Sequence, residues 1–346
     1  MWGFPKRSEK TVISLLPLTN PANRFLAMFS QALSEQGYVV QSFRWNSLLL
    51  ARTSFIFFHW PDEFFAPGNS FEGIKSLTKL VVVHIAKILW RAKLVWVAHN
   101  AKPHDSASLD SLPKRWFLRS LDGVVFLSEH SCNLIRDLYP EIRPCETLVT
   151  VHPHYRGSSV SHETPCANER GNINLLHFGQ IRPYKNIEGL VDAASSVSFG
   201  FHLSIVGMVV DQALCETIQS KVQRLSHITI DFRQAPLGEA ELEMIVDSSD
   251  AVVLPYKNIL NSATALFSLS RNRPILAPNM GSLPELRETV GHDWVYLYDG
   301  EFRAEVLGEF REWILATRRA ATAPLDAYDL RRVGQDLRGF IEAMNG

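Results

Sequence analysis

The middle of this chain holds two cations in a position that suits a phosphate. An apolar run, Leu175–Phe178, is followed by Gly179, which permits a sharp backbone turn. Arg182 and Lys185 come next, just before a helical pattern that Asn186 opens. Arg binds phosphate oxygens in a bidentate fork, Lys acts as a point charge, and a helix N-terminus attracts anions. The segment therefore predicts a phosphate site at the carboxyl end of a strand, although two solvated surface cations would give the same pattern.

A second apolar run, Ala251–Leu254, ends in a loop with related chemistry. Lys257 adds a cation, and Tyr256 can either stack on a ligand or pack in the core. Small polar residues then stand at the start of the apolar helical pattern at 265–270, namely Asn261, Ser262 and Thr264. They can cap the helix, or they can leave its first backbone N–H groups free for a diphosphate. Two loops of this kind in one half of the chain favour a nucleotide site.

The first half of the chain carries side chains that can move protons, again just after apolar runs. One group follows residues 55–58 and the other follows residues 94–98, so both are predicted at the carboxyl ends of strands. A carboxylate or an imidazole placed there can act as a general base, although turn caps and strand-end hydrogen bonds use the same residue types. The leading candidates are Asp62 and Asp105, followed by His104 and His99.

Short apolar strands alternate with helical patterns along the chain, which predicts an α/β fold with parallel sheets. Strands are predicted at 11–16, 38–43, 55–58, 94–98, 123–127 and 148–151, then from 173, and at 202–206, 228–232, 251–254, 274–277 and 294–297. Helices are predicted near 22–35, 73–90 and 111–121. Residues 157–172 are rich in Ser, Glu, Asn and Gly and indicate a linker. We therefore expect one domain at 1–156, a second at 173–324, and a helix at 325–346 that can cross back to the first domain.

Composition narrows the functional classes. A chain of 346 residues can bury two medium-sized cores, and its net charge of −1 gives no basic field for nucleic acid. The four cysteines form no CxxC pair and no metal-ligand spacing, which favours a reducing compartment and no structural zinc. The N-terminal residues show no signal-peptide pattern, and no uncharged apolar run of about 18 residues predicts a membrane span. These features predict a cytoplasmic globular protein.

One stretch, residues 71–97, has the composition of a helix that lies on a membrane. It combines Leu, Ile, Val and Trp with five cations and one acid, and a second cationic aromatic cluster follows at 114–119. The alternative is an ordinary helix that packs on the sheet with a solvated lysine face, which the run Val81–Val83 favours. The cations expected to face an anionic surface are Lys75, Lys79, Lys87, Arg91, Lys93, Lys114 and Arg115.

Taken in order, these motifs resemble a GT-B glycosyltransferase, and more closely the inverting β-mannosyltransferases of xanthan-type polysaccharide assembly, glycosyltransferase family 94. The residues that carry the resemblance are His59–Asp62, His99–Asp105, His154–Arg156, Leu175–Lys185, Val252–Lys257, Asn261–Thr264 and Trp294–Phe302. The resemblance implies two Rossmann-like domains whose parallel sheets face a central cleft. It also implies a first domain that binds the acceptor and a second that binds the nucleotide sugar.

The same resemblance implies a function. The chain is expected to move mannose from GDP-mannose onto a lipid-linked oligosaccharide in exopolysaccharide or cell-surface glycan synthesis, at the inner face of the plasma membrane. His59, Trp60, His154 and Tyr155 are then expected to contact the acceptor or to brace the hinge. Three alternatives stay open: a GT-B transferase that uses a UDP- or dTDP-sugar, a non-catalytic nucleotide-sugar-binding module, and a sugar-nucleotide epimerase.

Two patterns are missing from the sequence. It has no Asp-x-Asp metal motif, so we expect no metal or other cofactor, with Arg182, Lys185 and Lys257 neutralising the diphosphate. The Glu-x7-Glu pattern of the retaining glycosyltransferase family 4 is also missing, since Ile259 and Phe267 occupy its positions. Both absences favour an inverting, metal-independent transfer.

Overall fold

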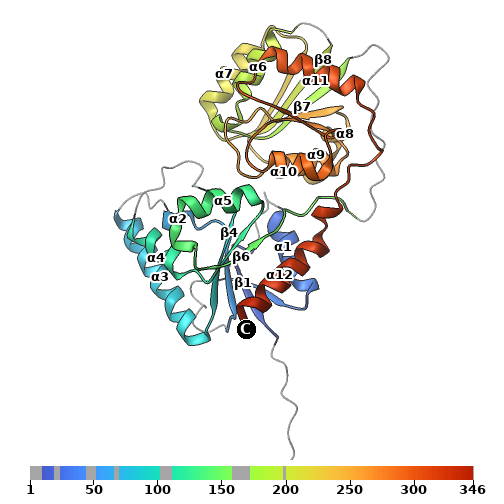
Figure 1. The fold of residues 1–346 in the computed structure, drawn as a ribbon. Helices are drawn as coiled ribbons and strands as arrows, with labels where there is room; N and C mark the ends of the chain where they lie inside the picture. The colour runs from blue at the N-terminus through green and yellow to red at the C-terminus, as the bar shows by residue number, and fades with distance from the viewer. Residues whose placement is uncertain are drawn as a thin grey trace, which may run out of the picture. The chain divides into compact units, whose positions relative to one another are not determined.

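The computed structural model describes residues 10–18, 24–43, 52–65, 70–101, 111–157, 172–197 and 200–345. These residues form two compact α/β units, each with its own sheet and core (Figure 1). Unit 1 contains the described residues up to Pro153 together with those from Tyr328 onward, and unit 2 contains those from His154 to Ala327. Two α/β units with parallel sheets confirm the fold class that the sequence predicts.

The sheet of unit 1 has six parallel strands in the order β2-β1-β3-β4-β5-β6. The strand order reverses between β1 and β3, and ligands of open α/β sheets bind beyond the carboxyl ends of the strands at such a point. The strands are β1 Val12–Leu16, β2 Val39–Ser42, β3 Phe55–Phe58, β4 Lys93–Ala98, β5 Gly123–Phe126 and β6 Glu146–Val149.

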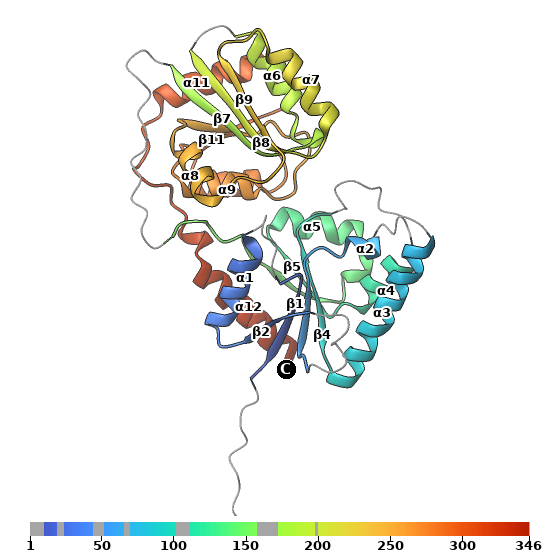
Figure 2. The same cartoon turned by 180° about the vertical axis from the view of Figure 1, so that it is seen from behind.

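Helices cover both faces of this sheet. Figures 1 and 2 show α1 and α12 on one face and α3 and α4 side by side on the other. None of the helices in the described part of the chain is long and apolar enough to cross a membrane. The helices of unit 1 are α1 Phe25–Glu35, α2 Asp62–Phe65, α3 Ser70–Trp90, α4 Leu112–Ser120, α5 Glu129–Leu138, the 3-10 turn η1 Pro140–Ile142, and α12 Leu330–Asn345.

The last helix, α12, belongs to the core of unit 1. Its side chains Val333 and Leu337 are buried against α1 and the sheet, in one cluster with Phe29. A Cβ atom added at Gly334 would lie 3.0 Å from a backbone carbonyl of α1, so the two helices approach closely. The hydroxyl of Thr150, just after β6, donates to a carboxylate of α12 at 2.9 Å. The core of unit 1 is therefore built from both ends of the described chain.

The sheet of unit 2 also has six parallel strands, in the order β12-β11-β10-β7-β8-β9, so its order reverses between β7 and β10. Its strands are β7 Ile173–Ile181, β8 Phe201–Val209, β9 Ile228–Arg233, β10 Ala251–Val253, β11 Ile275–Pro278 and β12 Val295–Tyr298. Helices α6, α7 and α11 bury apolar side chains against one face of the sheet. The helices are η2 Pro183–Lys185, α6 Ile187–Ser195, α7 Gln212–Val222, α8 Glu239–Asp247, α9 Ala263–Ser270, α10 Leu283–Val290 and α11 Ala304–Ala316, and η3 Asp326–Tyr328 lies at the return to unit 1.

The structure corrects the local prediction at Gly179. The residue does not end the strand in a sharp turn, because β7 continues to Ile181 and Gly179 pairs with Gly207 of β8. The strand β10 stops earlier, with Val252 opposite Leu176, so the last residues of β7 project beyond it. The turn itself is formed by η2, whose last residue is Lys185.

Candidate active site

Lys185 is a buried cation at the point where the strand order of unit 2 reverses. Its side chain is 6% exposed, and a Cβ atom added at Gly179 would lie 2.5 Å from its Nζ. The ammonium also lies 5.9 Å from the centre of the Tyr256 ring. Gly179 therefore leaves the space that the ammonium occupies, which explains why this strand position carries no side chain.

No carboxylate balances this charge within the described residues. Lys185 has no ion pair there, and burial lowers the pKa of its ammonium to about 8, with the nearby charge of Arg182 as the second cause. Arg182 is partly buried, and its Nε donates to Gln180 at 2.9 Å. A buried ammonium without a counter-ion is costly, and binding of an anion would compensate for that cost.

His177 is a second buried polar group beside Lys185, and sequence reasoning assigns it no role. Its Nδ1 bonds the carbonyl of Val253 at 2.8 Å, and its Nε2 has no hydrogen-bond partner among the described atoms. Burial, followed by the charge of Lys185, lowers the pKa of this imidazole to about 3. His177 is therefore neutral and adds no charge to the site. It leaves a polar nitrogen available within the same strand as Gly179.

The loop after β10 is held against the turn after β7. The backbone N–H of Lys257 donates to the carbonyl of Tyr184 at 2.8 Å, and the Lys257 side chain is exposed. Tyr256 is buried, and its hydroxyl hydrogen-bonds with Ser262 and Thr264; burial raises its pKa to about 12. Tyr256 is thus a core residue that fixes the start of α9.

Ser262 is the N-cap of α9, as one of the two interpretations of the sequence predicts. Its side chain accepts a hydrogen bond from the backbone N–H of Ala265 at 3.1 Å. Asn261 precedes it in the loop and is partly buried. The residues predicted for donor binding in this loop therefore lie at one helix start, close to the end of β10. The first N–H groups of that helix point where an anion is favoured.

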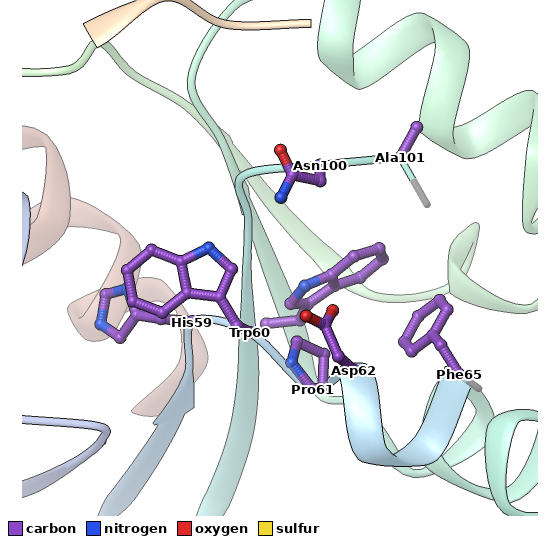
Figure 3. A pocket seen from close by; sticks show the side chains of 8 residues that line it. His59, Trp60, Pro61, Asp62, Phe65, Asn100 and Ala101 are labelled. Atoms are coloured by element: carbon purple, nitrogen blue, oxygen red, sulfur yellow. The ribbon is translucent and has the colours of Figure 1, made fainter. Parts of the chain in front are cut away.

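Unit 1 has a small, open pocket at the carboxyl ends of β3 and β4 (Figure 3). Asp62, the first residue of α2, points its carboxylate into the pocket, and Asn100 points into it from the end of β4. The residues that line the pocket are His59, Trp60, Pro61, Asp62, Phe65, Trp96, Asn100 and Ala101. An exposed carboxylate between aromatic walls and an amide can bind a sugar hydroxyl and accept its proton.

Three histidines of unit 1, His59, His99 and His152, form a cluster beside Trp60. His59 Nδ1 lies 3.1 Å from His99 Nε2, and the His99 ring stacks on Trp60 with 4.6 Å between ring centres. Burial lowers the pKa of His59 to about 3 and that of His152 to about 4. Burial, then the neighbouring His59 and His152, lowers the pKa of His99 well below its ordinary value.

These neutral histidines hold the wall of the pocket in place. Among the candidate bases that the structure describes, Asp62 is the one whose side chain is exposed to the pocket. The other two candidate bases, His104 and Asp105, lie outside the described residues. Among the described residues, no group of three or more His, Cys, Asp or Glu side chains is arranged to hold a metal ion.

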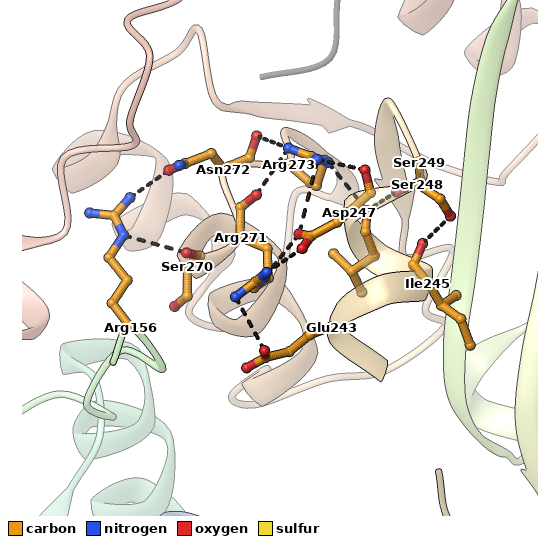
Figure 4. Close-up of polar contacts among 11 residues, drawn as sticks. Arg156, Glu243, Ile245, Asp247, Ser248, Ser249, Ser270, Arg271, Asn272 and Arg273 are labelled. Carbon is orange, nitrogen blue, oxygen red and sulfur yellow. Dashed lines mark hydrogen bonds and ion pairs between the residues drawn. The ribbon is translucent and has the colours of Figure 1, made fainter. Parts of the chain in front are cut away.

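Of the residues predicted for the acceptor or the hinge, His154 and Tyr155 belong to unit 2, and Tyr155 and the next residue, Arg156, contact one turn of that unit. Figure 4 shows Arg156 beside this turn. The N–H of Tyr155 donates to the hydroxyl of Ser270 at 2.9 Å, and Arg156 Nη2 donates to the amide oxygen of Asn272 at 2.6 Å. The same oxygen accepts the N–H of Ala323 at 3.1 Å. His154 is partly buried beside them, and its Nδ1 accepts the N–H of Arg156 at 3.2 Å.

Two buried arginines fix that turn to α8 and so serve the fold. Arg271 pairs with Asp247 and, at 3.5 Å, with Glu243. The guanidinium of Arg273 donates to the carbonyls of Val246 at 3.2 Å and Asp247 at 2.7 Å. Figure 4 shows both side chains directed toward α8. Their donors are therefore occupied, and we assign them no part in ligand binding.

Two substitutions at Asn272 separate what its amide oxygen and its left-handed backbone conformation each contribute to stability. Asn272 is buried and has φ 56°, a left-handed conformation that Gly adopts freely. Asn272→Gly is expected to lower the free energy of unfolding by about 1–3 kcal/mol, because Arg156 and Ala323 lose their acceptor. Asn272→Ala is expected to cost a further ~1–2 kcal/mol of backbone strain. Urea unfolding of the whole chain measures both, and an Ala variant as stable as the Gly variant would contradict the assignment.

Comparisons with known proteins show which proteins this chain resembles. No family model matches the chain. A GDP-mannose:glycolipid 4-beta-D-mannosyltransferase of Xanthomonas campestris pv. campestris is 31% identical over 319 residues, which span 87% of this chain and 83% of that protein. A second protein of the same name and species is 30% identical over 318 residues, with the same two coverages of 87% and 83%.

Solved structures resemble the chain over almost its whole length. Anabaena Alr3699/HepE in complex with UDP-glucose has a TM-score of 0.63 at 14% identity, covering 97% of this chain and 98% of that one. The sucrose-phosphate synthase of Thermosynechococcus elongatus has a TM-score of 0.64 at 12% identity, covering 97% and 95%. At these identities the likeness shows the fold, which is GT-B.

Proposed function

This chain belongs to the family of the GDP-mannose:glycolipid 4-beta-D-mannosyltransferases, and on that premise we propose that it transfers mannose from GDP-mannose to a glycolipid acceptor. It is a glycosyltransferase of the GT-B fold. Within that class, we assign it to the inverting enzymes of glycosyltransferase family 94. GDP-mannose carries its sugar in α linkage, so a β-linked product requires inversion at the anomeric carbon.

The observation that carries the proposal is the buried, uncompensated ammonium of Lys185. It lies beside Gly179 at the strand-order reversal of unit 2, next to Arg182 and near the N-terminus of α9. Cations and helix N-termini stabilise the negative charge that develops on a departing nucleoside diphosphate. We assign the diphosphate to Lys185 and Arg182, and the phosphate-facing backbone to the start of α9 at Ser262.

The acceptor half of the proposal rests on the pocket of unit 1. An inverting transfer is one displacement: the acceptor oxygen bonds the anomeric carbon, the bond to the diphosphate breaks, and a base takes the hydroxyl proton. Asp62 offers an exposed carboxylate in a pocket with Trp60 and Asn100. We assign the base to Asp62, with Asp105 as the alternative.

We propose that the transfer needs no divalent metal. The support is the positive charge that the chain itself supplies, from Lys185 and Arg182 inside the site and Lys257 at its edge. These groups are of the kind that neutralises a leaving diphosphate. The glycolipid acceptor places the reaction at a membrane, and we propose the cytoplasmic face of the plasma membrane and a role in exopolysaccharide or cell-surface glycan synthesis.

Thermal-shift binding in the presence of EDTA tests the donor assignment. GDP-mannose and GDP are expected to stabilise the purified protein, by about 2.7 kcal/mol at a ligand concentration 100 times the dissociation constant. UDP-glucose, UDP-glucuronate and dTDP-rhamnose are the controls and are expected to have little effect. Stabilisation by the UDP or dTDP compounds instead would overturn the mannose assignment and keep the fold. Stabilisation by GDP-mannose only after a divalent metal is added would overturn the metal-independent part.

A further inference from the structure

Helix α3 of unit 1 exposes a continuous apolar stripe on the face that points away from the sheet. Its inner face is buried through Leu80, Val83 and Ala86. On the opposite side, Phe71 is 75% exposed and Ile88 is 78% exposed. Between and beside them, at spacings of three, four and seven that keep one helix face, lie Ile74, Val81, Ile85 and Leu89. A soluble surface rarely keeps such a stripe without a function.

Cations flank the stripe on both sides. Lys75 and Lys79 follow it along one edge of α3. Helix α4 packs along the other edge, where Trp116 Nε1 donates to His84 Nε2 at 3.0 Å. On that helix Arg115 and Arg119 are exposed one turn apart. Glu72 is the only acid in the sequence of the two helices, whereas the chain as a whole has a net charge of −1.

Lys87, which the sequence places in this surface, has a different role. Its ammonium pairs with Asp122 at 2.7 Å and donates to the carbonyl of Ser120 at 2.8 Å. Lys87 therefore links α3 to the segment before β5 and is not one of the cations that border the apolar stripe. The surface that matters is the apolar stripe of α3 with Lys75, Lys79, Arg115 and Arg119 at its borders, which we call the α3 surface.

We propose that the α3 surface docks unit 1 on an anionic bilayer, with the stripe in the acyl boundary and the flanking cations among the lipid headgroups. An apolar face bordered by Lys and Arg is complementary to such an interface in both polarity and charge. A second copy of the chain is a poorer occupant, because a two-fold contact brings each patch onto itself and so brings the same cations together. The inference deepens the proposed function, which needs a glycolipid acceptor, but its test requires no turnover.

Co-sedimentation with vesicles tests the proposal. The wild-type chain is expected to bind phosphatidylcholine vesicles that contain about 30% phosphatidylglycerol, and to bind pure phosphatidylcholine weakly. Replacing Phe71 and Ile88 by Ser is expected to raise the lipid concentration for half binding about tenfold or more. Lys75→Gln with Lys79→Gln is expected to have a similar effect that disappears at high salt. Met244→Ser is the matched control, because Met244 is a 66% exposed apolar side chain on unit 2.

Unchanged binding of the Phe71→Ser, Ile88→Ser variant would overturn the proposal, and so would an equal loss in Met244→Ser. A wild type that is dimeric without lipid, and becomes monomeric on the same double substitution, would show that a second copy occupies the stripe. Stabilisation by GDP-mannose is measured on every variant. It is expected to stay unchanged in the surface variants, which separates a failed docking surface from a failed donor assignment.

Discussion

Lys185→Met is expected to stabilise the free protein and to weaken its stabilisation by GDP-mannose. The ammonium is buried without a counter-ion, and burial lowers its pKa from 10.5 to about 8. A lowering of that size corresponds to roughly 3 kcal/mol of free energy. Below pH 8 the side chain stays charged, and the free energy of unfolding is lower by that amount. Met is apolar and of similar length, so it removes the cost together with the anion contact. Urea unfolding and thermal shift on the same samples measure the two effects.

The same two pKa values determine whether the stability of the protein rises or falls with pH. Between about pH 8 and 10.5 the unfolded chain keeps the Lys185 proton while the folded chain releases it, so stability rises with pH in this window. The stability advantage of Lys185→Met is therefore expected at neutral pH and is expected to vanish above pH 10.5. A variant that is less stable than wild type at pH 7 would contradict the view that this ammonium is uncompensated.

Lys185→Arg is the matched control for charge. The kcat/KM for the donor reports groups of the free enzyme, so the wild type is expected to lose activity about tenfold per pH unit above pH 8. Arg stays protonated throughout this range, so the fall is expected to move to higher pH in Lys185→Arg. Donor binding by Lys185→Met is expected to weaken between about thirtyfold and several thousandfold, the range for a lost buried charge partner. An identical pH profile in wild type and Lys185→Arg would remove Lys185 from the diphosphate site.

Asp62→Asn is expected to lower kcat about 10²- to 10⁴-fold, the usual contribution of a general base, and to leave donor binding unchanged. The amide keeps the shape of the carboxylate but cannot accept the proton of a sugar hydroxyl. Asp62 lies at the start of α2 and faces the pocket of unit 1, whereas the donor residues belong to unit 2. Steady-state kinetics and GDP-mannose thermal shift on one preparation separate the two effects.

Asp137→Asn is the control for the loss of a carboxylate, because Asp137 is an exposed residue of α5 on the same unit and lies outside the pocket. It is expected to behave as wild type. Asp105→Asn completes the set. Full activity in Asp62→Asn combined with inactive Asp105→Asn would transfer the role of base to Asp105.

The alternation of strands and helices is readable from sequence because buried parallel strands are short apolar runs with clear borders. Most predicted strands begin and end within two residues of the observed ones; β8 runs three residues further, to Val209. Helix α5 is not predicted, because its buried residues are Ser131, Cys132 and Ile135, of which only Ile135 is a large apolar side chain. Ser128 and Ser131, whose side chains form a capping box, have a spacing in the sequence that could have predicted where this helix begins.

Site chemistry is only partly readable from sequence. The residue types after β7 and β10 indicate a phosphate site, but the burial of Lys185 depends on Gly179 in a strand that projects beyond its neighbour. His177 looks like part of an apolar run, and only the fold shows an unpartnered nitrogen there. The side chain of Asn272 was equally unreadable, since its role depends on two segments distant in sequence that bind one amide oxygen.

The position of α12 has a consequence for the order in which the chain acquires structure during synthesis. Unit 2 is continuous in sequence from His154 to Ala327, so all of its strands have been translated before α12 exists. Unit 1 lacks a core helix until Leu330–Asn345 has left the ribosome, and the apolar face around Phe29 stays open to solvent until then. Unit 1, most of which precedes unit 2 in the chain, is therefore the unit whose core is completed last, which reverses the usual N-terminal-first order.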